Sequence, residues 1–283
     1  MNERVKNRLF CISDYFDDNI MFVAVRQGMV MTIPLLVCGS MALMFVSLPL
    51  PVYQEFLSDL WGGRVVEFFR FIQSASFGFF AVGLALTTSF SYAVIRQRDK
   101  GGAGGDPVMV MLITMVSLIG FSGIQQEGFS VASLGTNNIF TALFIALSCS
   151  ALFFKIKDKR LFVIQQRGME ADNCYAEAVS GIVPALLVVA FFAVFRQVFV
   201  AVFHVDSVQG LLEIAVGRLL GSIENGLIVA IAVLLLAHCM WLFGIHGSNV
   251  LEPVMQENFV RISEGAVFNK TFLDVFVHMG GTG

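Results

Sequence analysis

The residues best placed to do chemistry lie in "WLFGIHGSNVLEP", the stretch from Trp241 to Pro253. His246 follows a long apolar run and has Gly244 and Gly247 close on either side. Glycines permit a break in the helix, and non-helical backbone at membrane depth needs protein or a water-filled cavity to satisfy it. An ionisable residue at such a break, with Asn249 close by, is a binding-site candidate. On spacing alone, a histidine at the water interface just past the last helical turn explains the pattern equally well.

The other polar residues of the apolar segments are expected to have structural roles. His238 is expected to make a hydrogen bond between helices. Arg196 either extends toward the membrane interface or pairs with an acidic residue. His204 is expected at the surface, at the outer end of its helix. Three residues near the C-terminal end either line a polar cavity or belong to an unpaired terminus: Asp274, His278 and Thr282.

Metal, cofactor and phosphate sites are not expected. The five cysteines show no Cys-x-x-Cys spacing and are interpreted as small packing residues: Cys11, Cys38, Cys149, Cys174 and Cys239. The four histidines show no ligand spacing such as His-x-x-x-His. The glycine-rich turn from Lys100 to Pro107 lacks the Gly-Lys-Ser/Thr sequence of a phosphate loop.

Composition indicates an all-α, polytopic integral membrane protein. Only 14% of residues are charged and 57% are hydrophobic, whereas soluble domains carry about 25% charged residues. A net charge of -3 gives no argument for nucleic acid. A cleaved signal peptide is not expected, because acidic residues lie in the first 25 positions and no small-residue cleavage pattern precedes the first apolar run.

Six apolar runs are expected to be helices that cross or enter the membrane. Their approximate bounds are 28–50, 68–95, 107–120, 139–154, 182–203 and 227–243. Between the first two, 51–69 suits an interfacial helix or a short outer connection. Between the last two, 207–226 is amphipathic and is expected to lie along an interface. We therefore expect an N-terminal bundle of about five helices over 1–205, followed over 206–283 by a connector, the sixth helix and a re-entrant segment.

Positive charge predicts the orientation. Twelve of the 18 Lys and Arg residues fall in three segments, which lie before the first helix, at 96–100 and at 155–167. If each apolar run crosses the membrane once, two crossings separate neighbouring segments, so all three lie on one side. The positive-inside rule makes that side cytoplasmic. The N-terminus is therefore expected in the cytoplasm.

Several motifs resemble the enzyme IIC permeases of the bacterial phosphoenolpyruvate-dependent sugar phosphotransferase system, in the lactose, cellobiose and diacetylchitobiose branch. "WLFGIHGSNVLEPV" looks like the signature of that branch. "AVRQGMVMTIPLLVCGS" at 24–40 resembles the family's first span, and "LGTNNIFTALFIAL" at 134–147 resembles the fourth. "NKTFLDVFVHMGGTG" at 269–283 resembles the segment that leads into a Gly-Gly-Ser/Thr-Gly turn. The resemblance runs through the whole chain.

The resemblance implies a homodimeric permease of the bacterial inner membrane. Such a permease carries a β-linked disaccharide such as cellobiose or diacetylchitobiose inward. A phosphocysteine on the partner enzyme IIB then phosphorylates the sugar at its 6-hydroxyl. By this resemblance His246 would hydrogen-bond sugar hydroxyls, Gly244 and Gly247 would permit the backbone break, and Asn249 would add a polar contact. No residue of this chain is expected to be catalytic.

Two departures from the family pattern limit what is expected of this chain. The family continues past the Gly-Gly-Ser/Thr-Gly turn into a second hairpin with an Asn-Glu-Pro motif, whereas this sequence stops at Gly283. The proline-rich segment before the fifth span keeps only Pro184. We therefore expect no sugar phosphorylation by this chain alone. Phosphoenolpyruvate-dependent labelling of cellobiose by the chain with its partner enzymes would refute this. The alternative function is a membrane sensing or anchoring domain of a signalling protein, such as a cyclic-di-nucleotide phosphodiesterase.

Overall fold

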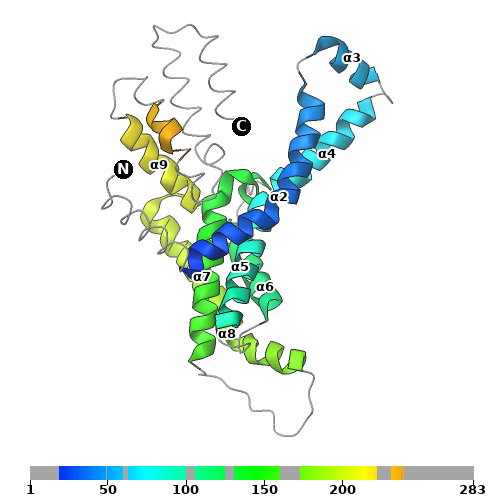
Figure 1. Cartoon of the computed structure of the whole chain (residues 1–283). Helices are drawn as coiled ribbons and strands as arrows, with labels where there is room; N and C mark the ends of the chain where they lie inside the picture. The colour runs from blue at the N-terminus through cyan, green and yellow to red at the C-terminus, as the bar shows by residue number, and fades with distance from the viewer. Residues whose placement is uncertain are drawn as a thin grey trace, which may run out of the picture.

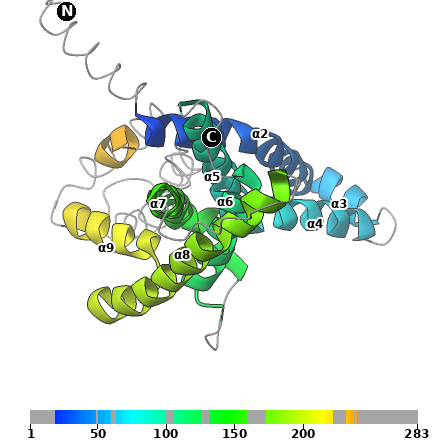
Figure 2. The same ribbon diagram turned by 90° about the horizontal axis from the view of Figure 1, so that it is seen from below.

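The computed structural model describes residues 19–48, 50–59, 63–99, 106–124, 131–159, 173–221, 231–236 and 238. Every regular element in these ranges is helical, as expected of an all-α membrane protein. Figure 1 shows a central group of helices and an arm that projects from it. Figure 2 shows α7 end-on, with α5, α6, α8 and α9 around it.

The first helix, α2 (Ile20–Ser47), is longer than expected at its start. The side chain of Asn19 accepts a hydrogen bond from the backbone N–H of Met21 at 2.9 Å, so the helix is capped there rather than at Gly28. The polar side chains of Arg26 and Gln27 had placed the predicted start too late. A helix tolerates them because their long side chains reach out of the packed face.

α2 packs antiparallel to the helices that follow it. Small residues on one face let α2 approach α5 (Phe80–Asp99) closely. A Cβ on Gly28 would lie 2.8 Å from the Cα of Thr88, so this crossing requires glycine. Further along α2, Gly39 lies against Phe77. Later residues of α2 therefore contact earlier residues of the segment 64–99, which is the order of an antiparallel pair.

The expected helix at 68–95 is two helices, which corrects the prediction. α4 (Arg64–Gly78) and α5 meet at Phe79 with a bend of 45°. With α3 (Pro51–Asp59) and the end of α2, α4 forms the arm in Figure 1. The ring of Phe45 stacks on Phe69 at 4.9 Å, and the Tyr53 hydroxyl donates to the Phe45 carbonyl at 2.9 Å.

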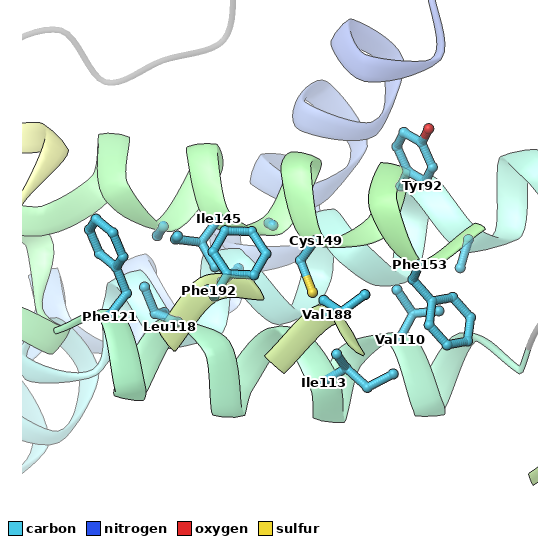
Figure 3. Close-up of a cluster of buried hydrophobic side chains, with 14 of the residues drawn as sticks. Tyr92, Val110, Ile113, Leu118, Phe121, Ile145, Cys149, Phe153, Val188 and Phe192 are labelled. Atoms are coloured by element: carbon cyan, nitrogen blue, oxygen red, sulfur yellow. The ribbon is translucent and has the colours of Figure 1, made fainter. Parts of the chain in front are cut away.

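The core forms where α6 (Pro107–Phe121), α7 (Ile139–Asp158) and α8 (Asn173–Phe203) meet α5. Figure 3 shows Phe121 and Leu118 at one end of this cluster and Val110 near Phe153 at the other. α6 begins at Pro107, as expected. Two 3₁₀ turns, η2 (Val131–Leu134) and η3 (Thr136–Asn138), precede α7. A shorter helix, α9 (Val208–Gly221), follows α8.

The lengths of the helices decide which of them can span a bilayer. Three described helical segments are long and apolar enough to do so: 20–47, 136–158 and 179–212. The bent pair of α4 and α5 is a fourth if it counts as one span, and α6 is apolar but has 15 residues. All five expected apolar runs before residue 205 are therefore helical, but they differ in length.

The cationic ends of the described helices lie together. At the end of α5, an Arg96 Nη2 atom lies 2.7 Å from an Asp158 carboxylate oxygen at the end of α7. The start of α2 points toward this end, because its contacts with α5 run in antiparallel order. The arm is at the opposite end. This arrangement agrees with the expectation that each apolar run crosses the membrane once, which places the basic segments on one side.

Candidate functional site at the junction with the C-terminal segment

The proposed sugar-contacting group lies outside the described residues. This applies to Gly244, His246, Gly247 and Asn249, and also to Asp274, His278 and Thr282. The expected sixth helix at 227–243 is helical where it is described, at 231–236 and at His238. What the structure describes is the junction that carries this part of the chain.

The junction begins with a buried arginine in α8. The Arg196 side chain is 7% exposed, and an Nη2 atom lies 3.6 Å from an Asp206 carboxylate oxygen. Its Nη1 atom donates to the carbonyl oxygen of Phe121, the last residue of α6, and lies 3.4 Å from the backbone oxygen of Asp206. Of the two interpretations of Arg196, pairing with an acidic residue is therefore confirmed.

The chain turns sharply after Arg196. α8 ends at Phe203, and the next residue is His204, whose backbone N–H donates to the Val200 carbonyl at 2.9 Å and whose φ of 55° lies in the left-handed region. His204 is exposed, as expected. Ser207 then accepts a hydrogen bond from the backbone N–H of Gly210 at 3.0 Å, which caps the start of α9.

A second contact holds α9 to the bundle. The backbone N–H of Gln209, in the first turn of α9, donates to the Thr141 hydroxyl of α7 at 3.1 Å. Both side chains are buried. Gly210 lies close beside this contact, because a Cβ there would come within 2.7 Å of a Val205 methyl group. α9 therefore starts in tight contact with both α7 and the turn before it.

Buried polar groups continue beside this contact. Asn138 precedes α7 and is 3% exposed. Its side-chain amide donates to the Ser133 carbonyl at 2.7 Å, while Oδ1 has no hydrogen-bond partner in the described part of the chain. Sequence reasoning did not single out Asn138, Thr141 or Gln209. The run "LGTNNIF" was a usable signal, because polar residues directly before an apolar helix indicate its start, although the side chain of Asn138 bonds to Ser133 and does not cap α7.

The described residues of the junction form a framework of buried hydrogen bonds. No group of three or more metal-ligating side chains occurs among the residues that the structure describes. Cys149 is buried against Ser117, with 3.9 Å between sulfur and oxygen, as expected of a packing cysteine. Cys38 is exposed, which corrects the prediction, because the small residues of α2 that face α5 lie on another side of the helix.

The hydrogen bond between helices that was expected of His238 stays a prediction. Among the described contacts, a ring nitrogen of His238 lies 2.7 Å from the Leu234 carbonyl oxygen, one turn earlier in the same helical segment.

Comparison with known proteins decides the family. The chain is 24% identical over 282 residues to the lichenan permease IIC component of Bacillus subtilis. It is 22% identical over 283 residues to the cellobiose-specific EIIC component of Geobacillus stearothermophilus. These matches cover 92% of this chain, and 61% and 62% of the two relatives. The chain is a homologue of the IIC permeases of the cellobiose branch.

Further comparisons agree with this homology. The oligo-beta-mannoside-specific EIIC component of Bacillus subtilis is 22% identical over 310 residues, with 100% of this chain and 66% of the relative covered. The crystal structure of ChbC, the IIC component of the N,N'-diacetylchitobiose-specific phosphotransferase system, matches with a TM-score of 0.64 and 20% identity. It covers 91% of this chain and 60% of ChbC, so the IIC homologue has the same fold over that part. No protein-family model matches the chain.

The IIC homologue spans about three fifths of the length of the first two curated relatives. It is an integral membrane protein, because its relatives are permeases and its described helices include three long apolar ones. The expected all-α membrane fold and the expected family are therefore confirmed.

Proposed function

We propose that this chain is a membrane permease component, an enzyme IIC, of a sugar phosphotransferase system. In this proposal the chain binds and translocates a β-linked disaccharide such as cellobiose or diacetylchitobiose. The observation that carries the proposal is the match over 92% of the chain to IIC components named for lichenan and cellobiose. The names of these relatives refer to permease and phosphotransferase components, which favours transport over the sensing or anchoring alternative.

In this proposal the sugar contacts the chain after the sixth helix. His246 donates to or accepts from sugar hydroxyls, Asn249 adds an amide contact, and Gly244 and Gly247 let the backbone leave the helix. Buried polar groups discriminate strongly between ligands with and without matching hydroxyls. Phosphorylation is performed by the phosphocysteine of enzyme IIB, so no residue of this chain is assigned a catalytic role.

The proposal includes the arrangement of the chain in the membrane. Residues 1–205 form the N-terminal bundle, and 206–283 form the connector and the beginning of the sugar-binding region. The proximity of the cationic helix ends near Arg96 and Asp158 supports a cytoplasmic N-terminus in the bacterial inner membrane. The N-terminal bundle is proposed to form a homodimer.

Binding of radiolabelled cellobiose and diacetylchitobiose to the purified protein in detergent tests the site. His246→Ala is expected to abolish binding, because it removes the polar contact to the sugar. His238→Ala is the matched control, since His238 bonds only within its own helical segment among the described contacts. Retained binding in His246→Ala, with a folded protein, would assign the sugar contact to other residues.

A further inference from the structure

Arg196 is a cation in apolar, almost fully buried surroundings, which disfavour a charge. The rings of Phe195 and Phe199 beside it in α8 both contact Phe121, and the arginine itself is almost fully buried. Moving a charge away from water has a large free-energy cost unless hydrogen bonds and an opposite charge compensate. An apolar side chain would fill this position without that requirement. The contacts of the guanidinium therefore indicate what the arginine does.

The contacts of the Arg196 guanidinium connect the end of α6 with the turn between α8 and α9. At the end of α6, the Phe121 carbonyl belongs to the last turn and carries the negative end of the helix dipole. In the turn, Asp206 offers both its backbone oxygen and its carboxylate. The guanidinium is suited to this task because its donors lie in a rigid planar fork.

The backbone of the turn between α8 and α9 is restricted on both sides. His204 adopts a left-handed conformation that non-glycine residues rarely take. Beyond it, Gln209 is attached to Thr141 of α7. The segment 204–209, which we call the elbow, is therefore held at α6 through Arg196 and at α7 through Thr141.

We infer that Arg196 is a positioning residue: it fixes the elbow to the end of α6 and so sets the direction in which the chain leaves the N-terminal bundle. Residues 231–238 and the motif around His246 follow from that point. The connection to sugar affinity rests on the proposed function, whereas the effect on the direction of α9 does not.

A distance measurement between α9 and the bundle tests the inference. Spin labels are placed on Arg218→Cys in α9 and Lys155→Cys in α7, both at exposed positions, in the full chain with its native cysteines replaced and in lipid nanodiscs. Double electron–electron resonance then measures the distribution of distances. We expect one narrow distance in the parent protein, and loss of it in Arg196→Met. A narrow distance retained in Arg196→Met overturns the inference.

Controls separate a change in direction from unfolding. A second label pair, Asp59→Cys with Lys155→Cys, spans the bundle and the arm without α9 and is expected to keep its distance. Arg70→Met removes an exposed cation from α4 and is expected to change neither pair. If Arg196→Met also loses the second distance, Arg196→Lys decides. This variant keeps a cation at the position but removes the planar fork that reaches both the Phe121 carbonyl and Asp206, so an unchanged α9 distance in it overturns the inference.

The sugar readout distinguishes the two proposals. Where the parent binds cellobiose, Arg196→Met is expected to weaken binding together with the change in the α9 distance. His246→Ala is expected to abolish binding and leave that distance unchanged. A parent that binds no sugar would contradict the proposed function, while the label distances would still decide the role of Arg196.

Discussion

Two helical glycines show how differently the same residue acts in this bundle. Gly28 of α2 lies against the backbone of Thr88, so α2 and α5 meet closely there. Gly120 of α6 is exposed, and an added Cβ would meet no atom within 4 Å. Since glycine costs a helix interior about 1 kcal/mol relative to alanine, packing must explain Gly28, whereas nothing in the described packing requires Gly120.

Alanine at the two positions is expected to have effects of opposite sign. Gly28→Ala should destabilise the protein by about 1–3 kcal/mol through overpacking, reduced by the gain in helix propensity. Gly120→Ala should leave stability unchanged or raise it by up to about 1 kcal/mol. Thermal unfolding of the purified proteins in detergent, followed by circular dichroism, measures both. Equal shifts in Tm would show that the contact with Thr88 can relax without cost.

Single residues also show what sequence reasoning can and cannot reach. Arg196 was recognisable as unusual, but its partners were not, because Phe121 and Asp206 are brought together only by the folded helices. A backbone carbonyl leaves no mark in a sequence. The group around His246 was found from its glycines and from resemblance, and it remains a prediction.

At the scale of elements, the boundaries of helices were predictable where a capping residue or a proline marks the helix start. The start of α6 was predicted because Asp106 and Pro107 form a capped first turn, with the Asp106 carboxylate accepting from the Val108 N–H at 3.0 Å. The break at Phe79 was missed, because α4 and α5 follow one another without proline; Gly78, the last residue of α4, and the loss of the amphipathic pattern after it mark the break. The start of α2 was missed because Arg26 and Gln27 interrupt the apolar pattern, although Asn19 caps the helix before them.

The cap of α6 gives a test at this scale. Asp106→Ala removes the side-chain acceptor of the first turn and is expected to cost about 1 kcal/mol. Asp99→Ala is the matched control, because Asp99 is an exposed acid at the end of α5, where it caps no helix start. Its effect should stay within about 0.5 kcal/mol. Unfolding in detergent measures the pair, and equal losses would mean that the cap contributes nothing beyond removal of a surface charge.

At the scale of the whole molecule, large apolar side chains lie on the surface of the described helices as well as in the core. α2 and α8 both expose large hydrophobic side chains along their lengths, among them Met41, Met44, Leu186 and Val194. A soluble monomer rarely leaves contiguous apolar areas of this kind uncovered. Lipid covers such surfaces in a membrane protein, and the proposed homodimer would cover part of them.

The position of the arm makes the orientation testable. α3 lies at the end of the bundle opposite the Arg96–Asp158 pair, because α2 and α5 are antiparallel and α3 follows the end of α2. With the cationic end in the cytoplasm, the tip of the arm faces outward. Asp59→Cys and Lys159→Cys, both at exposed positions, place a thiol at each end.

In intact cells producing cysteine-replaced protein, a membrane-impermeant maleimide is expected to label Asp59→Cys and to leave Lys159→Cys unlabelled. Opening the cells should make Lys159→Cys reactive, which controls for burial of that thiol. The reverse pattern in intact cells would invert the proposed topology without changing the fold. Labelling of both positions would contradict a single orientation, because the two ends of one bundle would then have reached the same side of the membrane.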